Sequence, residues 1–547
     1  MRLSNSDRHS MESPPSATAV EAWRQDLGEK SVIADAPFLA TYTESVCASQ
    51  RQVVAVLMPR SLEDVQKVVA TANAHKIPLY PISRGKQWGM GSRLPVEDGA
   101  AIVDLGRMNR IIEVNAQYHY AVVEPGVTQR QLLDHIKVNN LPLMLNVTGS
   151  TSDTSLIGNA MDRGVGYFDS RAHGISNMQV VLGNGETIQT GFGHYENAKT
   201  KNLYHHGIGP SLDGLFPQAN FGIVTSACID LMPKPDAHMA AIIRIDSEEK
   251  LPQLIDALVS LRSRGVFLSV AHVGNRERSY ITLAPLLYGQ LVEGGDPPHE
   301  ATRAKAIKML EVGGFGPWSA AIGVLGTKAQ LKLAKKEIRK AVGGFAKTMF
   351  LNDALVAGAR AVAEKLSFLP FVRTQLMMLK AVEPVYGFTR GDATDESLKA
   401  VYWAAGDFDR LEDPDPDHSN SGLLFCLPII PASGETVLEV VSDTRDTFAR
   451  HGFEAAITVN LMTTKAMEGV VSLAFDRRSE EQTKAAHACI QEMEARYMEQ
   501  GYPPYRVGIN SMHHVVCEDD PFWRTVRDLK QVLDPNGIIA PGRYNLV

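Results

Sequence analysis

The N-terminal part of the chain combines short apolar runs with one amphipathic stretch. Four runs, each closed by glycine, proline or polar turn residues, have the length and composition of strands: residues 53–57, 79–82, 101–105 and 119–123. Between the first two, apolar side chains recur at the spacing of one helix face: Leu62, Val65, Val68 and Val69. Ser61 stands at the N-cap position. The pattern predicts a helix over residues 61–75 among strands, and therefore an α+β domain.

The pattern changes after the Pro233-Lys234-Pro235 break. From there on, strand-like runs are each followed by a stretch with one apolar helix face: residues 240–245 with 251–264, 321–325 with 329–342, 423–430 with 436–451, and 458–475 with 480–499. Strands that alternate with helices predict a second sheet covered by helices. Residues 413–420 are predicted to form a floppy loop, because proline and aspartate favour turns over strand pairing.

Residues 1–28 show neither helical nor strand periodicity, so they are predicted to form a flexible tail. They also lack the apolar run of a secretory signal. No later stretch reaches the roughly 20 apolar residues that a membrane helix needs. We therefore expect a cytoplasmic protein with no membrane partner.

Charge and cysteine content exclude several classes of protein. The 547 residues include 62 acidic and 55 basic side chains, a net charge of −7, and no basic block that would favour nucleic acid as a partner. The five cysteines lie far apart, which excludes a disulfide framework or a zinc-ligand spacing and favours core thiols. The pairs His205-His206 and His513-His514 lack companions, so no metal site is predicted.

Two glycine-rich segments are the candidates for binding chemistry. In residues 81–92, three glycines follow a strand, and Arg84 and Lys86 add positive charge. Glycine lets backbone N–H groups converge on one anion, so this loop suits a phosphate, although a plain turn would show the same composition. It matches neither the Walker loop nor GxGxxG before a helix. In residues 155–167, a second glycine set suits close approach of the backbone to a flat ligand.

Together with residues 123–127 and 220–225, these segments resemble the FAD-binding half of the vanillyl-alcohol oxidase and p-cresol methylhydroxylase family. Residues 534–543 resemble that family's C-terminal return to the flavin. The resemblance implies an α+β fold of two domains, in which a PCMH-type FAD domain is built from both chain ends and an α/β cap is inserted between them. The expected boundaries are 1–28 for the tail, 29–235 and 495–547 for the FAD domain, and 236–494 for the cap.

The resemblance also implies FAD contacts. The first glycine loop would bind the pyrophosphate, the second segment would run past the flavin, and a positive charge at position 543 would stabilise the flavin N1/C2 edge. The predicted cofactor-binding residues are Pro81, Ile82, Ser83, Arg84, Gly85, Lys86, Gln87, Trp88, Gly89, Gly91, Glu124, Pro125, Gly126, Val127, Gly149, Ser150, Ile157, Gly158, Asn159, Gly164, Gly166, Tyr167, Gly222, Ile223, Val224 and Arg543.

Tyr505-Arg506 stands where the family carries a Tyr-Arg pair that holds a phenolic oxygen, and Tyr167 matches a further tyrosine near that site. A guanidinium and a phenol donor aimed at one oxygen favour the phenolate. The resemblance therefore implies oxidation of a para-substituted phenol, in which hydride leaves the benzylic carbon for flavin N5 and produces a p-quinone methide. The predicted catalytic residues are Tyr505, Arg506, Tyr167, Ser150 and Arg543.

The chain departs from the family pattern at three places. Met90 replaces a second phenolate-binding tyrosine, and Ser150 replaces an aspartate that serves as a base beside N5, for which Asp153 is the nearest substitute. The position of covalent flavin attachment, counted from Pro428, falls near Leu423, which cannot form the bond. His418 is expected to be solvated instead of flavin-linked, so we predict non-covalent FAD.

Several alternatives stay open. Either molecular oxygen or a separate electron-acceptor protein such as a cytochrome could reoxidise the flavin, and the chain itself has no CxxCH haem motif. The resemblance favours a homodimer or larger homo-oligomer. Because Met90 and Ser150 remove two polar groups, the substrate could be a bulkier phenol, an aliphatic alcohol or a hydroxy acid. A flavin-binding scaffold without turnover is the alternative outside enzymes.

Overall fold

The computed structural model describes residues 15–366 and 368–545. Its first sheet has the order β1-β2-β4-β3, with strands β1 (Val32–Ile33), β2 (Val53–Leu57), β4 (Ala100–Asp104) and β3 (Leu79–Ile82). Strands β2, β4 and β3 are parallel, and α3 (Leu62–His75) connects β2 to β3. The strands predicted at 53–57, 79–82 and 101–105 and the helix predicted at 61–75 are confirmed to within one residue.

Ser61 caps α3 as predicted, since its side chain accepts a hydrogen bond from the Asp64 N–H at 3.2 Å. We expect Ser61→Ala to destabilise this part of the protein by about 1 kcal/mol, because one N–H of the first helical turn loses its acceptor. The shift of the urea midpoint in equilibrium unfolding measures this effect. Ser61→Asp, which restores an acceptor, is the control and is expected to recover the midpoint.

The tail prediction is wrong for the residues that can be checked. Residues 15–27 form helix α1 (Pro15–Leu27), which packs against α3. The indole of Trp23 is fully buried and donates from Nε1 to the Val68 carbonyl at 3.2 Å. Residues 1–14 lie outside the described residues. Helix α1 is therefore part of the first core.

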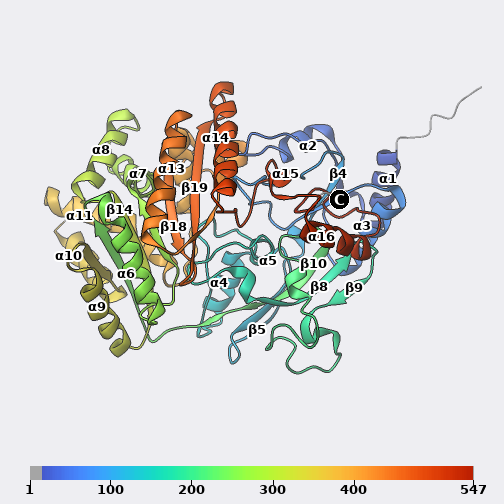
Figure 1. Ribbon diagram of the computed structural model, residues 1–547, viewed down its shortest axis with the longest axis horizontal. Helices are drawn as coiled ribbons and strands as arrows, with labels where there is room; N and C mark the ends of the chain where they lie inside the picture. The colour runs from blue at the N-terminus through green and yellow to red at the C-terminus, as the bar shows by residue number, and fades with distance from the viewer. Residues whose placement is uncertain (1–14, 367, 546–547) are drawn as a thin grey trace, which may run out of the picture.

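The N-terminal part also contains the short antiparallel pair β7 (Leu143–Met144) and β11 (Met232–Pro233) and a second, larger antiparallel sheet. That sheet has the order β5 (Ile111–Asn115), β6 (Tyr120–Val123), β10 (Gly222–Asp230), β8 (Ile175–Leu182) and β9 (Thr187–Gln189). Helices α4 (Gln129–Val138) and α5 (Leu156–Met161) lie between its strands in the sequence. The C-terminal segment returns to the first sheet, where Leu79 N donates to Ile538 O and Ala540 N donates to Leu79 O, both at 2.7 Å. Helix α16 (Pro521–Leu533) lies on this side of the molecule (Figure 1).

The third sheet is antiparallel and forms the other half of the molecule (Figure 1). Its strands run in the order β15 (Lys347–Leu351), β12 (Ala237–Ile245), β14 (Trp318–Gly326), β13 (Ala271–Asn275), β18 (Ala456–Leu461), β19 (Ala466–Asp476) and β16 (Ser421–Cys426), with β17 (Ile429–Pro431) also paired to β19. The predicted strands at 423–430 and 458–475 are thus two strands each. The four predicted strand-and-helix units are present, and we call this half the cap.

Helices cover both faces of the cap sheet. One face forms the largest apolar core, against α6 (Leu251–Ser263), α9 (Lys328–Val342), α13 (Gly434–Arg450) and α14 (Glu480–Glu499). A second apolar cluster lies among helices that the sequence pattern did not predict: α7 (Arg276–Glu293), α8 (Glu300–Val312), α11 (Pro370–Phe388) and α12 (Lys399–Ala405). Helix α14 continues five residues past the expected cap boundary at 494.

Other surface and core features follow from the same arrangement. Cys47, Cys228, Cys426 and Cys489 are buried free thiols, whereas Cys517 is exposed, so the core-thiol prediction fails for Cys517.

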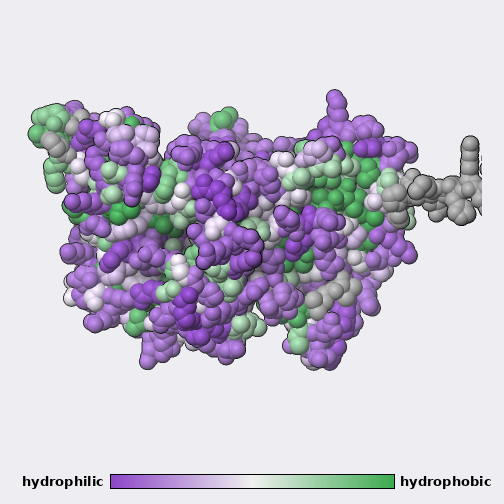
Figure 2. All heavy atoms as spheres, turned by 90° about the horizontal axis from the view of Figure 1, so that it is seen from above, coloured by the Kyte–Doolittle hydropathy of each residue, from purple (hydrophilic) through white to green (hydrophobic). Residues whose placement is uncertain are grey.

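An apolar surface patch lies at the cap end of the molecule, where α10 (Asp353–Lys365) meets α11 (Figure 2). In the described ranges, no helix is both long enough and apolar enough to cross a membrane.

Candidate active site

A cavity of about 630 Å³ lies between the N-terminal sheets and the cap. One wall comes from the first glycine loop, from the segment 148–167, from the start of β10 and from the C-terminal return. The opposite wall comes from one face of the cap sheet and from α7, α11 and α12. Both halves of the fold are therefore needed to form it.

Most of the predicted FAD-binding residues line this cavity. They are Pro81, Ile82, Ser83, Arg84, Gly85, Lys86, Gln87, Trp88, Gly149, Ser150, Ile157, Gly158, Asn159, Tyr167, Gly222, Ile223, Val224 and Arg543. Other predicted residues do not line it: Gly89, Gly91, Glu124, Pro125, Gly126, Val127, Gly164 and Gly166. The glycines of this second group serve packing, as the contacts of their missing Cβ atoms show.

Gly89 and Gly91 have φ values of +78° and +128°, in the region that favours glycine. A Cβ at Gly89 would meet the Phe425 ring, and one at Gly91 would meet Ile509. At Gly126 it would lie 2.5 Å from the Gly106 carbonyl oxygen. Gly89 and Gly91 thus let the first glycine loop pack closely against its neighbours, and Gly126 does the same for the segment 123–127.

The remaining lining fits an FAD. The glycines of this lining also pack against the chain, since a Cβ at Gly85 would lie 2.6 Å from Arg93 Cγ and one at Gly158 would lie 2.9 Å from Ser83 Oγ, so the fit rests on polar atoms. Two buried polar atoms here, Arg84 Nε and Asn159 Oδ1, have no hydrogen-bond partner among the described residues. A ligand with phosphate oxygens and ring N–H groups would supply what these atoms lack.

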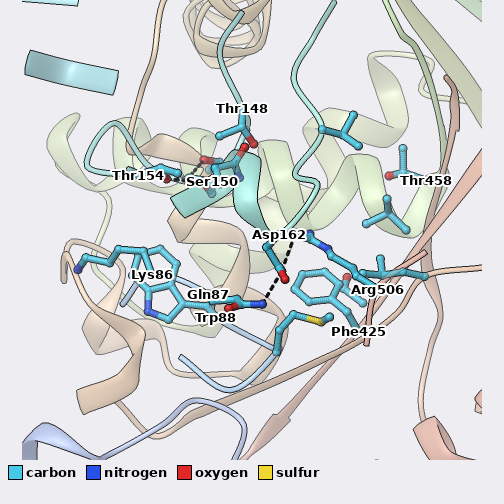
Figure 3. Close-up of a pocket in the computed structure, with 18 of the residues that line it drawn as sticks. Lys86, Gln87, Trp88, Thr148, Ser150, Thr154, Asp162, Phe425, Thr458 and Arg506 are labelled. Atoms are coloured by element: carbon cyan, nitrogen blue, oxygen red, sulfur yellow. Dashed lines mark hydrogen bonds and ion pairs between the residues drawn. The ribbon is translucent and has the colours of Figure 1, made fainter. Parts of the chain in front are cut away.

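The buried carboxylate of Asp162 is the centre of the polar network. It accepts hydrogen bonds from Gln87 Nε2 at 2.5 Å and from Arg543 Nη2 at 2.8 Å, and it lies 3.5 Å from Arg506 Nη1 (Figure 3). Arg543 also donates from Nη1 to the Tyr80 hydroxyl at 3.0 Å. One carboxylate thus orients two guanidinium groups in the cavity wall, and together they leave an excess of one positive charge.

Tyr505 and Glu468 lie beside Arg506. Glu468 is buried on β19 and accepts a hydrogen bond from the Tyr505 hydroxyl, while its Oε2 accepts one from Asn460 Nδ2 at 3.2 Å. Burial raises the pKa of the Glu468 carboxyl, although Tyr505 and Arg506 oppose that shift. Burial also raises the pKa of Tyr505 well above its ordinary value, so Tyr505 is a neutral donor. The network therefore offers a donor, a cation and a proton acceptor in one place.

Tyr167 forms another part of the lining. Its ring lies 4.3 Å from the His272 ring and 4.7 Å from the Phe388 ring, centroid to centroid. Burial raises the pKa of Tyr167 and lowers that of His272 to about 4, so both are neutral near pH 7. His272 also contacts Asn460, with 2.7 Å between its Nδ1 and the amide oxygen. An uncharged aromatic wall results.

Two of the residues that depart from the family pattern lie in the cavity wall. Met90 and Ser150 line the cavity, and the Ser150 hydroxyl lies 2.6 Å from the Thr154 hydroxyl. Asp153 does not line it: its carboxylate is paired with Arg84 at 3.0 Å and is 41 % exposed. Asp153 is therefore no substitute for the missing aspartate. Of the two carboxylates that line the cavity, Asp162 is paired with Arg506 and Arg543, and Glu468 has no such double pairing among the described residues.

The predicted floppy loop at 413–420 is instead held against the first glycine loop. Asp415 pairs with Lys86 at 3.2 Å and with Arg93 at 2.6 Å. Asp417 is fully buried and accepts from the Ser92 hydroxyl at 2.6 Å. The sequence pattern identified the loop but could not reveal these partners, because they lie more than 300 residues away.

Leu423 and Phe425 are the side chains of β16 that line the cavity, and neither is nucleophilic. His418 points elsewhere, with its Nδ1 3.0 Å from Glu44. We expect acid precipitation of the purified protein to leave a yellow supernatant, because no covalent link would hold the flavin. The measurement is the flavin fluorescence of pellet and supernatant, and a pellet that keeps the fluorescence would contradict non-covalent binding.

Five residues of the site were missed by reasoning from the sequence: Asp162, Arg278, His272, Asn460 and Glu468. The last three were detectable in principle. Each is a polar residue in a strand whose other residues are mostly apolar, which indicates that its side chain lies on a face that does not join the core.

Comparisons with known proteins agree with this arrangement. Residues 53–191 match the FAD binding domain family, and residues 429–544 match the C-terminal domain of FAD linked oxidases. The chain is 33% identical over 540 residues to 1'-carboxy-chondrochloren decarboxylase of Chondromyces crocatus, covering 98% of each protein. It is 29% identical over 537 residues to the flavoprotein subunit of 4-cresol dehydrogenase [hydroxylating] of Pseudomonas putida, covering 96% of this chain and 95% of the relative.

Solved structures show the same likeness. The crystal structure of p-cresol methylhydroxylase with substrate bound matches with a TM-score of 0.83 at 27% identity, over 98% of each chain. The 4-ethylphenol oxidase of Gulosibacter chungangensis in its isoeugenol complex matches with a TM-score of 0.82 at 25% identity, also over 98% of each chain. The two-domain FAD-binding architecture predicted from the sequence is thereby confirmed. The chain belongs to the vanillyl-alcohol oxidase and p-cresol methylhydroxylase family of FAD-dependent oxidoreductases, and FAD is its cofactor.

Proposed function

We propose that this flavoprotein oxidises a para-substituted phenol by transfer of hydride from the benzylic carbon to the flavin. The observation that carries the proposal is the meeting of Tyr505, Arg506 and Glu468 in the wall of one cavity. A donor, a cation and a proton acceptor at one point suit the ionisation of a phenol. Relatives whose names specify 4-cresol and 4-ethylphenol support this choice of substrate.

Tyr505, Arg506 and Glu468 each have a separate role in the proposed reaction. The neutral Tyr505 hydroxyl accepts a hydrogen bond from the phenol while it donates its own proton to Glu468, and Arg506 stabilises the phenolate that forms. The proton of the phenol passes through Tyr505 to Glu468. The negative charge then increases the electron density at the para position, so that hydride can leave the benzylic carbon and the substrate becomes a p-quinone methide. Water adds to this product, or it rearranges.

Bound FAD supplies the hydride acceptor, its N5 atom. In this proposal Arg543, held by Tyr80 and Asp162, would help to hold the flavin and would stabilise the negative charge that hydride uptake brings. Tyr167 and Ser150 line the substrate side, where they shape the pocket without acting as bases. Reoxidation by oxygen or by a separate cytochrome, a homodimeric assembly and a cytoplasmic location all stay predictions.

A second candidate is the decarboxylation of a phenolic acid by the same site. The name of the decarboxylase relative suggests it, and the cavity wall contains a half-buried arginine, Arg278, that has no carboxylate partner among the described residues. In that reaction the carbon–carboxyl bond would break and carbon dioxide would leave as the substrate gives two electrons to the flavin. Release of carbon dioxide in step with flavin reduction would identify it.

Anaerobic mixing with a panel of para-alkyl and para-hydroxymethyl phenols tests the main proposal, with flavin absorbance as the measurement. Bleaching by these phenols supports it. Bleaching by aliphatic alcohols or hydroxy acids alone would move the assignment to the aliphatic alternative. A flavin that no compound reduces would indicate a binding scaffold.

A further inference from the structure

The cavity face of the cap sheet carries its polar groups in ordered rows. Strand pairing sets His272, Asn460 and Glu468 side by side across β13, β18 and β19. Two residues further along lies a row of Gly274, Thr458 and Val470, in which only Thr458 is polar. The first row belongs to the Tyr505 end of the site. The rows beyond it form a separate part of the same cavity, which the proposed hydride transfer does not use.

Arg278 extends across this second part from the start of α7. A Cβ at Gly274 would lie 3.2 Å from the Arg278 Cγ, so the glycine makes room for the arginine stem on the sheet. The guanidinium donates from Nη2 to Ser472 Oγ at 2.6 Å and to the Ala456 carbonyl at 3.0 Å. Its Nε is buried and has no acceptor among the described residues.

Arg244 and Arg278 are the cations of the lining without a carboxylate partner among the described residues, and of the two only Arg278 has a buried donor, Nε, that lacks an acceptor there. Six cationic side chains line the cavity against two carboxylates, Asp162 and Glu468: Arg84, Lys86, Arg244, Arg278, Arg506 and Arg543. Four of the six are paired with carboxylates of the chain: Arg84, Lys86, Arg506 and Arg543. Arg244 donates to the backbone carbonyls of Gly313 and Gly314. Arg278 forms no ion pair within the described residues, and burial lowers its pKa to about 10, so it enters the site as an uncompensated cation.

We propose that Arg278 binds a carboxylate at the far end of the substrate's para side chain. This inference rests on the proposed phenol oxidation and narrows its substrate class. Ser472, which accepts a hydrogen bond from Arg278, lies on the same face of β19 as Glu468. The two residues are four positions apart, which corresponds to roughly 13 Å of strand. A cresol is too short to span that distance. A phenol with a side chain of several carbons that ends in a carboxylate places one end at Tyr505 and the other at Arg278.

A carboxylate is the anion that the site favours. One negative charge balances one guanidinium, and a planar carboxylate can take up the hydrogen-bond donors that the chain leaves unused. A purely structural role, joining α7 to β18 and β19, would account for the two bonds of Nη2. It would not account for an uncompensated charge in the wall of a cavity.

The test compares 4-(4-hydroxyphenyl)butanoate with its methyl ester. The dissociation constant of each is measured anaerobically from the change in flavin absorbance, which reports binding whether or not the flavin is reduced. We expect the acid to bind at least about tenfold more tightly than the ester, because the uncharged ester cannot form the charge-assisted hydrogen bond with Arg278. In Arg278→Gln, which keeps an amide donor for Ser472, the acid should lose this preference, and Arg278→Lys should keep part of it.

Arg262→Gln is the matched control, because Arg262 is also held by backbone carbonyls of the cap, those of Ser269 and Met462, but does not line the cavity. It should keep the full preference for the acid. Equal binding of acid and ester by the unmodified protein, or an undiminished preference in a flavin-loaded Arg278→Gln, would overturn the inference. If both compounds bind and neither reduces the flavin, the proposed oxidation fails, while the ratio of the two constants still decides the role of Arg278.

Discussion

Replacing Glu468 by glutamine is expected to slow flavin reduction by phenols by a factor on the order of a hundred to ten thousand, the range that general-base catalysis contributes. Glutamine keeps the size of the side chain and can still bond Asn460 and Tyr505, the two neighbours of Glu468. It cannot take up the proton that the phenol must lose. The measurement is the rate of anaerobic flavin reduction in a stopped-flow instrument.

The pH dependence gives this prediction a second readout. Burial raises the pKa of Glu468, and only the ionised carboxylate accepts a proton. The reduction rate of the unmodified protein should therefore be low below this raised pKa and rise as the pH increases through it. Glu468→Gln should lack that rise, since no group remains to ionise at this position.

Glu494 provides the control for a buried carboxylate. It lies on α14, burial raises its pKa to about 7, and it does not line the cavity. Glu494→Gln should reduce its flavin at the normal rate and keep the pH-dependent rise. An unchanged rate and profile in Glu468→Gln would remove Glu468 from the proposed mechanism.

The second large effect concerns Arg506. If its guanidinium stabilises the phenolate, Arg506→Ala should slow reduction on the order of tenfold to a hundredfold, since one charge-assisted hydrogen bond is worth about 1.5–3 kcal/mol. Arg506→Lys should recover only part of the rate, because a point charge replaces a planar fork that also lies against Asp162. Reoxidation of the flavin should change much less, because the phenolate is no longer present in that step.

The methyl ether of a substrate phenol is the chemical counterpart of this variant. It cannot form a phenolate, so it should not reduce the unmodified protein at a comparable rate. Rapid reduction by the ether, or normal reduction in Arg506→Ala, would favour the aliphatic-alcohol alternative, in which Tyr505 and Arg506 only line the cavity.

Local patterns predicted much of the fold. The periodicity of Leu62 to Val69 and the cap at Ser61 located α3, because both signals act within one or two turns. The sequence pattern did not predict helix α1, because the buried face of this helix consists of little more than Ala19, Val20 and Trp23 in an otherwise polar stretch. Packing against α3, and not its own periodicity, stabilises that helix.

The site was less accessible from the sequence, because its contacts join distant parts of the chain. Asp162 and Arg543 are 381 residues apart, and only the folded chain brings them together. Glu468 was not identified as a site residue, because the sequence pattern predicted one continuous strand over 458–475. The turn that separates β18 from β19 reverses the chain there and sets Glu468 opposite Asn460, on the face that lines the cavity.

The return of residues 538–540 to β3 has a consequence for the order of events during synthesis. Strand β3 is the edge of the first sheet, and this segment is what bonds to Leu79 along that edge. On the ribosome the glycine loop emerges early, whereas Arg543 is added after every other residue of the cavity wall. The wall is therefore incomplete until translation has passed this segment. Cofactor loading should be a late event, and nascent chains that stall before residue 538 should carry no tightly bound flavin.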